Sequence, residues 1–351
     1  MMNNTAIKIS CKNLWKIYGP NQKLRFGQTN SATEQNNKLE KLVSQEDHVG
    51  AVCNVSFDIL EGEIFVIMGL SGSGKSTVIR CLSRLIDPTA GEVFFEGKDL
   101  LKASASEMIE MRRHKMGMVF QNFGLMPHLN VLDNVAFPLR LQGMRRPERE
   151  KRARDIINLV GLEGREKSFP RELSGGQQQR VGIARSLAVE PEIWYLDEPF
   201  SSLDPLIRGQ MQEEFVRLQK LLNKTIVFIT HDFLEAIRLA DRIAIMKEGR
   251  VVQIGTPAEI VMKPADDYVA KFTKDVPRAK LIRAQDCMKI NQFPDAKKDT
   301  FKVPADATLE EIIKNLSEKK QDCSVLSPEG KIIGHISAET VIDALAEVNT
   351  K

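Results

Sequence analysis

The sequence predicts an α/β protein built on a mainly parallel, helix-covered β-sheet. Short apolar, β-branched runs at residues 64–69, 192–197, 225–230 and 242–246 are strand-sized and alternate with helical segments. The first run ends in a glycine-rich turn that leads into a helix expected at residues 75–85. Strands that alternate with helices favour a parallel sheet, and such sheets bind ligands at the carboxyl ends of their strands.

The amino-terminal part of the chain is expected to add two features to this sheet. Residues 7–18 have the pattern of a strand, which we place at a sheet edge. Residues 20–49 are polar and rich in Asn, Gln, Lys and Glu, so they predict an insertion that is partly helical near residues 32–45. Further strands are expected at residues 92–95 and 116–120.

The rest of the chain divides into a helical stretch and a tail. Residues 122–172 are mostly charged and carry apolar residues at helical spacing, which predicts helices. Pro264 and Pro277 mark a linker, and from about residue 280 the sequence predicts a small αβ unit, too short for a second enzyme. After a first strand, its expected elements are a helix at 308–318, strands at 323–326 and 331–336, and a helix at 338–346.

The composition argues against several classes of protein. With 50 basic and 47 acidic side chains among 351 residues, the net charge of +3 gives no general attraction to nucleic acid or anionic lipid. The five cysteines are scattered singly, which favours buried free thiols in a reducing compartment over disulfides or a zinc site. No apolar run reaches the ~18 residues of a membrane span, and the first residues lack the features of a secretory signal. We therefore expect a cytosolic chain; if it serves a membrane process, another polypeptide supplies the membrane part.

A phosphate-binding loop is predicted between the first apolar strand and its helix. The run GLSGSGKST fits G-x-x-x-x-G-K-[ST] in the strand–turn–helix context that this motif requires. Glycines let backbone N–H groups turn toward phosphate oxygens, and the helix start adds its positive dipole end. Lys75 is expected to reach the β- and γ-phosphates of ATP, and Ser76 to place its hydroxyl on Mg²⁺. The alternative is a glycine-rich turn that only joins strand to helix. The expected ATP-binding residues of the loop are Gly69, Ser71, Gly72, Ser73, Gly74, Lys75, Ser76 and Thr77.

Polar residues at the ends of three further strands predict hydrolytic chemistry. Asp197 ends the strand IWYLD and suits a Mg²⁺ ligand, while Glu198 suits the general base that polarises an attacking water. Gln121 follows the strand MGMVF, where its amide reaches Mg²⁺ or water, or caps the strand. His231 follows the strand TIVFIT, where its imidazole can hydrogen-bond the γ-phosphate. The alternatives are a pair of solvated acids in a turn and a surface histidine.

The run LSGGQ at residues 173–177 precedes a helix and alone would predict no more than a helix N-cap. Together with the phosphate-binding loop and the strand that ends in Asp-Glu, it resembles the signature motif of ABC-type ATPases. The order of motifs matches that family over roughly residues 7–275: residues 69–77, Gln121, 173–177, Asp197 and Glu198, the run SLD ending at Asp204, and His231.

The resemblance implies a P-loop ABC ATPase core, with a mainly parallel sheet flanked by helices, an antiparallel β part and a helical subdomain at about residues 122–190. It also implies a homodimer, because a chain cannot fold its own signature motif onto its own phosphate-binding loop. Two ATP molecules would then lie between two head-to-tail chains. The γ-phosphate in one chain would meet the other chain's Ser174, Gly175, Gly176 and Gln177.

Two further positions follow from the resemblance. Asp204 would sit at the dimer seam, across from the partner's phosphate-binding loop. An aromatic residue near the first strand usually stacks on adenine in this family. Tyr18 is the first candidate and Trp15 the second, against the alternative that Tyr18 is an ordinary strand residue.

Finer resemblance points to the glycine betaine/proline branch of quaternary-amine importers, on the runs EGEIFVIMGLSGSGKST, MVFQNFGLMPHLNVLDNVAF, DPLIRGQMQ and GTPAEI. It implies uptake of glycine betaine, choline, proline or a related osmolyte. The expected partners are integral-membrane permease subunits and, indirectly, a solute-binding protein, with no nucleic acid. The chain would lie peripherally at the cytoplasmic face of the inner membrane. Residues 122–140 would receive a permease coupling helix in a socket, or form local core, through Phe123, Leu125, Met126 and Pro127.

The tail resembles one cystathionine-β-synthase (CBS) module, which gives an ATPase domain at residues 1–275 and a regulatory module at 276–351. Such modules usually pair, so we expect pairing across the dimer, against a purely structural role. Two other functions stay open: an ABC importer ATPase for a different small solute, and a soluble ABC-type ATPase that acts on nucleic acid or ribosomes. The second usually carries two cassettes or long coiled coils, and no extended basic stripe is present here.

Overall fold

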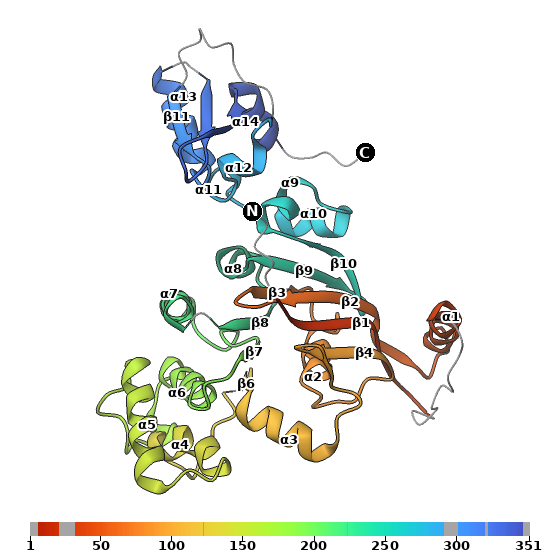
Figure 1. Cartoon of the computed structure of the whole chain (residues 1–351), viewed down its shortest axis with the longest axis vertical. Helices are drawn as coiled ribbons and strands as arrows, with labels where there is room; N and C mark the ends of the chain where they lie inside the picture. Colours follow the sequence, from red (N-terminus) through yellow and green to blue (C-terminus); the bar gives the residue numbers. More distant parts are fainter. Residues whose placement is uncertain are drawn as a thin grey trace. The chain divides into compact units, whose positions relative to one another are not determined.

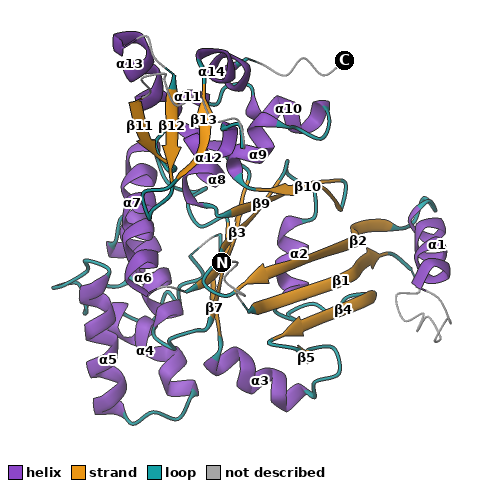
Figure 2. Ribbon diagram, turned by 45° about the horizontal axis from the view of Figure 1, so that its top comes forward, coloured by secondary structure: helices purple, strands orange, loops and turns teal. Residues whose placement is uncertain are grey.

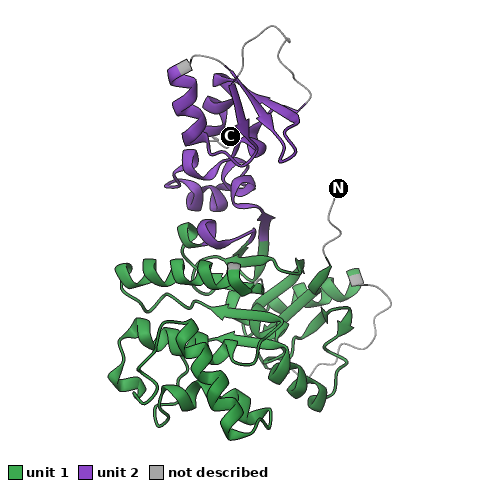
Figure 3. Cartoon of the chain, turned by 60° about the vertical axis from the view of Figure 1, so that its left-hand side comes forward, with its two compact units in different colours: residues 1–235, 244–251 green, residues 236–243, 252–351 purple. Residues whose placement is uncertain are grey.

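The computed structural model describes residues 6–20, 32–121, 123–222, 224–290, 301–319 and 322–346. The chain forms two compact units, coloured separately in Figure 3. Unit 1 comprises Met1–Glu235 and Ala244–Val251, and unit 2 comprises Ala236–Ile243 and Val252–Lys351. The expected division at residues 275 and 276 falls inside unit 2, between helices α10 and α11.

A six-stranded sheet with the order β10-β9-β3-β8-β7-β6 carries the predicted apolar strands. Strands β3, β8, β7 and β6 pair in parallel, as the alternation of strands and helices predicted. Every residue of β3, β7 and β8 is buried, which is typical of a parallel sheet covered on both faces. The strands are β3 (Ile64–Met68), β6 (Met116–Val119), β7 (Ile193–Asp197), β8 (Thr225–Thr230), β9 (Arg242–Lys247) and β10 (Arg250–Gly255).

A second, antiparallel sheet has the order β2-β1-β4-β5, and Figures 1 and 2 show its three long strands side by side. The expectation that β1 lies at a sheet edge is wrong, because β1 pairs with β2 on one side and β4 on the other. An alternating strand pattern shows which face is buried, but not whether both backbone edges are paired. The strands are β1 (Ile7–Tyr18), β2 (Val49–Leu60), β4 (Ala90–Phe95) and β5 (Lys98–Asp99).

The insertion before β2 contains the predicted helix, α1, beside β1 and β2 (Figures 1 and 2). The insertion's residues 21–31 lie outside the described part of the chain. Helices α4, α5 and α6 pack on one another and form the helical part expected after residue 122. The helices of this stretch and of the sheet are α1 (Ala32–Val43), α2 (Lys75–Leu82), α3 (Ala105–His114), α4 (Val131–Leu141), α5 (Arg146–Leu159), the 3₁₀ turn η1 (Pro170–Glu172), α6 (Gly175–Leu187), α7 (Pro205–Leu222) and α8 (Phe233–Leu239).

An aromatic cluster fixes β7 and β8 against α7. Phe215 of α7 lies 5.5 Å from Trp194 of β7 and 5.9 Å from Phe228 of β8, measured between ring centroids. Phe200 lies 5.8 Å from Phe228 and completes the cluster. Buried aromatic pairs at this spacing contribute beyond their buried area. The strand ends that carry Asp197 and His231 are therefore held by packing directly beneath them.

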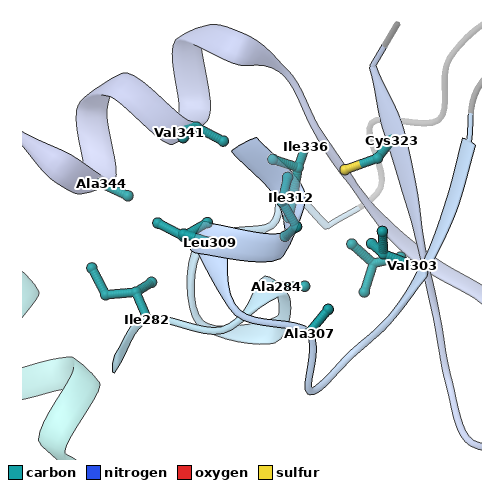
Figure 4. Packing of buried hydrophobic residues seen from close by; sticks show 11 residues of the cluster. Ile282, Ala284, Val303, Ala307, Leu309, Ile312, Cys323, Ile336, Val341 and Ala344 are labelled. Atoms are coloured by element: carbon teal, nitrogen blue, oxygen red, sulfur yellow. The ribbon is translucent and has the colours of Figure 1, made fainter. Parts of the chain in front are cut away.

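Unit 2 contains its own hydrophobic core, as Figure 4 shows. Its three-stranded sheet has the order β11-β12-β13, with β11 and β12 parallel and β12 and β13 antiparallel. Helices α13 and α14 flank it, as the sequence predicted. The elements are α9 (Pro257–Met262), α10 (Asp267–Thr273), α11 (Arg278–Leu281), α12 (Ala284–Cys287), β11 (Phe301–Pro304), α13 (Leu309–Lys319), β12 (Cys323–Leu326), β13 (Ile332–Ile336) and α14 (Ala338–Leu345).

The buried side chains of the tail core come from α12, β11, α13, β12, β13, α14 and the connections beside them. In Figure 4, Ile312 of α13 points toward Ile336 of β13, and Leu309 points toward the side of the core where Ile282 and Ala344 lie. All five cysteines of the chain are free thiols; Cys287 is half-buried and the other four are buried, as their scattered positions predicted. Among the described residues, no helix is both long enough and apolar enough to cross a membrane.

Candidate active site

The phosphate-binding loop joins β3 to α2 and is shaped by three glycines with positive φ: Gly69 (+154°), Gly72 (+81°) and Gly74 (+99°). A Cβ on Gly69 would stand 2.3 Å from the carbonyl oxygen of Met246, and one on Gly74 would stand 2.0 Å from that of Ala51. Gly74 is also the N-cap of α2 and provides no side-chain cap. The first amides of α2 are thus left available to an anion, as the sequence motif predicted.

Lys75 is folded back into its own loop. Its side chain is 4% exposed, and its ammonium donates hydrogen bonds to the carbonyls of Gly69 (2.9 Å) and Leu70 (3.0 Å). Burial lowers the pKa of Lys75, against the opposing effects of Glu198 and Asp197. A bound phosphate group would stabilise the charged form of the Lys75 ammonium, which burial destabilises.

The pair Ser76 and Asp197 fits a magnesium site. The Ser76 hydroxyl donates a 2.8 Å hydrogen bond to Asp197 Oδ1, so a hydroxyl and a carboxylate oxygen meet where α2 and β7 converge. Burial raises the pKa of Asp197, which Ser76 and Arg80 only partly oppose; the Arg80 guanidinium lies 3.7 Å from Oδ2. Within the described ranges, no group of three or more His, Cys, Asp or Glu could hold a metal by itself. Mg²⁺ binds one or two protein oxygens together with phosphate and water, and the Ser76 hydroxyl and Asp197 carboxylate are oxygen ligands of this kind.

Glu198 is the centre of the predicted hydrolytic group. Its Oε2 accepts a hydrogen bond from the Gln121 amide at 3.2 Å and lies 3.1 Å from His231 Nδ1. Its Oε1 lies 3.9 Å from the Lys75 ammonium. The carboxylate is therefore oriented from three sides by the ends of β6, β8 and the phosphate-binding loop. Its backbone has φ +46°, a strained value for a non-glycine residue, of a kind that clusters at active sites.

These groups open into one cleft of about 980 Å³. Of the residues expected to bind ATP, those that line it are Ser71, Gly72, Gly74, Lys75, Ser76, Thr77, Gln121 and His231, together with Glu198. Gly69, Ser73 and Asp197 are not among the lining residues, but Gly69 accepts a hydrogen bond from Lys75, and Asp197 accepts one from Ser76. The structure thus brings together the groups that the sequence placed at the carboxyl ends of four strands.

Tyr18 is not among the described residues that line the cleft. Its ring lies under the Lys16 ammonium, 5.0 Å from nitrogen to centroid, and its cross-strand partner Val49 reaches the cleft instead. The sequence reasoning also missed the second half of the cleft wall, because the polar insertion gave no signal of a ligand contact. That wall comprises Val43, His48, Val49, Gly50, Ala51, Cys53, Glu248 and Arg250.

The signature residues stand at the start of α6, and they do not line this chain's own cleft. Ser174 and Gln177 form a capping box: the Ser174 hydroxyl accepts from the Gln177 amide, and the Gln177 side chain accepts from the Ser174 amide. Ser174 and Gly175 are exposed. Asp204 caps α7 by accepting from the Ile207 amide at 3.1 Å. Their roles toward a partner's nucleotide stay predictions.

Comparison with known proteins identifies the family. Residues 52–201 match the family model described as ABC transporter. A trimethylamine N-oxide transport system ATP-binding protein of Pelagibacter ubique (strain HTCC1062) is 49% identical over 95% of this chain and 96% of its own length. The glycine betaine/proline betaine transport system ATP-binding protein ProV of Escherichia coli (strain K12) is 45% identical over 97% of this chain and 84% of its own length.

A solved structure shows the same core. The ATP-binding cassette MJ0796, a dimer in a post-hydrolysis state bound to ADP and Pi, superimposes with a TM-score of 0.59 at 34% identity. The match covers 71% of this chain and 98% of that one. The chain belongs to the family of ATP-binding subunits of ABC transporters.

Proposed function

We propose that this chain hydrolyses ATP as the motor subunit of an importer for a small methylated-amine osmolyte. The observation that carries the hydrolytic part is the contact of Glu198 with Gln121, His231 and Lys75 at the mouth of the phosphate-binding loop. The proposal is supported by a carboxylate, a cation and the Ser76 hydroxyl that line one cleft, with that hydroxyl hydrogen-bonded to Asp197.

Each residue of the site has a separate role in the proposed hydrolysis. Lys75 exchanges its two loop carbonyl partners for phosphate oxygens when ATP binds. Mg²⁺, held by Ser76 and Asp197, would supply positive charge to the phosphates. Glu198 accepts the proton of the attacking water, and Gln121 and His231 hold its carboxylate in place. Because Glu198 Oε2 can only accept, His231 Nδ1 carries the hydrogen in this contact.

The Glu198→Gln variant tests this assignment. The amide cannot take a proton, so we expect steady-state ATP hydrolysis to fall by about 10²- to 10⁴-fold while ATP binding persists. Glu110→Gln, which removes an exposed carboxylate of α3, is the matched control and should hydrolyse ATP at the parent rate. Parent-level hydrolysis by Glu198→Gln would show that another group acts as the base.

Two copies of the chain would sandwich the nucleotides. The exposed Ser174 and Gly175 at the start of α6, and the dimeric MJ0796 cassette, support this arrangement. In Mg²⁺ and ATP, Glu198→Gln should elute as a dimer, and adding Ser174→Arg should return it to a monomer. If the double variant still dimerises under these conditions, the seam does not involve Ser174.

A groove of about 440 Å³ supports docking of a permease. It is bounded by Ile109 of α3, Met116 and Met118 of β6, and Phe137 and Leu141 of α4. Of the four expected socket residues, Met126 lines the groove, whereas Phe123, Leu125 and Pro127 are not among its described lining residues. Arg185 holds the adjoining segment by donating to the carbonyls of Gly124 and Phe123. A bound permease would keep the chain at the inner face of the membrane.

The substrate class follows from the relatives. The trimethylamine N-oxide protein aligns over nearly its whole length, and the glycine betaine/proline betaine protein over 84% of its own, so both belong to the proposal. In vesicles that contain this chain and its permease, a solute-binding protein loaded with trimethylamine N-oxide or glycine betaine should stimulate ATP hydrolysis. If neither solute stimulates, this substrate class is wrong while the ATPase assignment stands.

The tail remains a proposed CBS-like regulatory module. Its support is the αβ arrangement of β11 to α14 around one core. Pairing of two tails across the dimer predicts that a dimer of Glu198→Gln chains protects the exposed face of α14 from deuterium exchange. Equal exchange in monomer and dimer would contradict that pairing.

A further inference from the structure

The contact between His231 and Glu198 depends on how the backbone of His231 is held. The His231 side chain is 54% exposed, and its Nδ1 lies 3.1 Å from Glu198 Oε2. Exposed side chains change rotamer within nanoseconds, so packing alone does not keep this ring on the carboxylate. The turn between β8 and α8, which carries His231, must therefore set the direction of the ring.

The residues on both sides of His231 are tied to Glu235, in the first turn of α8. The Thr230 hydroxyl accepts a 2.9 Å hydrogen bond from the Asp232 amide and donates one to the Glu235 carboxyl group. The Asp232 carboxylate accepts a 3.1 Å hydrogen bond from the Glu235 amide. Glu235 thus contacts the residue before the histidine and the residue after it, and the turn is closed around His231.

Glu235 is in turn anchored to α7. Its Oε1 accepts a 2.8 Å hydrogen bond from the side-chain amide of Gln212, and both side chains are buried. Arg208 provides a second connection: its Nη1 lies 3.9 Å from Asp232 Oδ2, and its Nη2 donates to the Leu203 carbonyl at 3.2 Å. Because α7 packs on β7 and β8 through the aromatic cluster, it gives the turn a rigid support.

The chemistry of the Glu235 side chain fits a role in geometry better than a role in the core. The residue is only 6% exposed, and burial raises the pKa of its carboxyl group, an effect that Asp232 reinforces and Arg208 opposes. An apolar side chain of similar volume would avoid the cost of burying an acid. It would also leave the Thr230 hydroxyl and the Gln212 amide without their acceptor. The acid therefore provides hydrogen-bond acceptors at this point.

A small cavity places Glu235 next to the hydrolytic group. Glu235, Glu198 and His231 line the same cavity, which has a volume of about 10 Å³. That volume holds about one water molecule and is far too small for a nucleotide. Glu235 is also not among the described residues that line the nucleotide cleft. Any effect of Glu235 on hydrolysis must therefore pass through its neighbours.

We propose that Glu235 is a positioning residue that holds His231 against Glu198. It does so by fixing the turn between β8 and α8 to helix α7 through Gln212. The inference rests on the proposed ATPase function, in which His231 orients the carboxylate of the general base. It adds to that function a buried acid that supports the histidine without touching the nucleotide.

Steady-state ATP hydrolysis by the full chain tests this role. Glu235→Leu removes both acceptors, so kcat should fall roughly 10- to 100-fold, the loss that a small misplacement can cause. KM for ATP should stay unchanged, because the phosphate-binding loop is intact. Glu235→Gln retains an acceptor oxygen and should keep kcat close to the parent value. Thr230→Val removes the hydroxyl between Asp232 and Glu235 and should lower kcat as Glu235→Leu does. Leu218→Ala, the matched control, removes buried apolar volume from α7 and should lower stability without lowering kcat.

A double-mutant cycle shows whether the effect passes through His231. Glu235→Leu should lower kcat in the parent and cause no further loss in His231→Ala. Equal fractional losses in both backgrounds would overturn the proposal, as would a Glu235→Gln that is as slow as Glu235→Leu. If Glu235→Leu fails to fold, as judged by urea unfolding, Thr230→Val replaces it in the cycle and the same two outcomes apply. Parent-level kcat in His231→Ala would instead refute the histidine's role in the proposed function, and the inference with it.

Discussion

Substituting two glycines of one loop separates backbone strain from steric overlap. Gly72 has φ +81° and Gly74 has φ +99°, so alanine is strained at both, by about 1–2 kcal/mol. A Cβ on Gly72 would meet nothing within 4 Å, whereas one on Gly74 would stand 2.0 Å from the Ala51 carbonyl oxygen and 3.4 Å from Gly249 Cα. Both neighbours are backbone atoms, and Gly249 is held by hydrogen bonds from its amide to the Ser73 carbonyl and from the Cys53 amide to its carbonyl, so neither can move aside cheaply.

The expected free energies follow from these distances. Alanine restricts the unfolded chain at either position, which returns about 0.4–1 kcal/mol and leaves Gly72→Ala close to 1 kcal/mol destabilised. Gly74→Ala adds the overlap, for which about 1–3 kcal/mol is typical of overpacked sites. The difference between the two variants should therefore be about 1–3 kcal/mol, or roughly 5- to 150-fold in the ratio of folded to unfolded protein.

Urea unfolding followed by tryptophan fluorescence measures this difference. The chain has two tryptophans, Trp15 and Trp194, and both are buried in unit 1, so the signal reports on the unit that contains the loop. The experiment is run without nucleotide, so that a change in phosphate binding does not enter. Equal unfolding free energies for Gly72→Ala and Gly74→Ala would show that the loop relaxes away from Ala51 and would refute the reasoning.

Three more predictions concern buried groups away from the cleft. Burial raises the pKa of Glu235 above its ordinary 4.5, against the hydrogen bonds from Thr230 and Gln212, so the folded state binds this proton more tightly than the unfolded state. The stability of the parent should therefore fall as pH rises from 4.5 through the raised pKa, and the urea midpoint of Glu235→Gln should fall less across that window. Asn134 is fully buried and its side chain hydrogen-bonds to both the amide and the carbonyl of Met126, so Asn134→Ala should destabilise the fold by about 1–3 kcal/mol. It should also reduce the stimulation of ATP hydrolysis by permease more than basal hydrolysis, and equal losses in both assays would count against a role of this segment in permease docking. Leu309→Ala should lower the stability of the tail core by about 2–5 kcal/mol, which should speed amide exchange in unit 2 and leave tryptophan fluorescence unchanged. A matching loss of tryptophan fluorescence would contradict separate cores in the two units.

Local patterns predicted the loop between β3 and α2 well. The spacing of Gly69, Gly74 and Lys75 fixes a loop whose geometry depends mainly on its own backbone. The positions of Gln121 and His231 were also predictable, because each follows a buried strand, and parallel strands bring their carboxyl ends to one edge. What the sequence could not provide was their mutual contact on Glu198, since that depends on strand order across 77 and 33 residues of chain.

The cleft wall formed by α1 and β2 could not be predicted for a different reason. Whether Tyr18 faces the cleft depends on where the insertion packs, and its polar composition gives no period that reveals the buried Leu39 or the contact of Asn36 with Trp15. The misplacement of β1 at a sheet edge has the same origin, because pairing partners distant in sequence leave no mark on the strand itself. The roles of Ser174 and Asp204 stay predictions, because they concern contacts with a second copy of the chain.

The strained backbone at Glu198 connects fold and chemistry. Its φ of +46° would cost about 1–3 kcal/mol at an arbitrary position. Here the backbone is fixed on both sides: its amide donates to the Ile229 carbonyl at 3.1 Å, and its carbonyl accepts from the Ser201 amide at 3.3 Å and hydroxyl at 3.0 Å. Asp197, one residue earlier, still belongs to β7 and accepts a hydrogen bond from Ser76, whereas Glu198 accepts one from Gln121. The turn at Glu198 therefore gives the two adjacent carboxylates different partners. The positive φ at Glu198 therefore separates the carboxylate proposed as a metal ligand from the one proposed as the base.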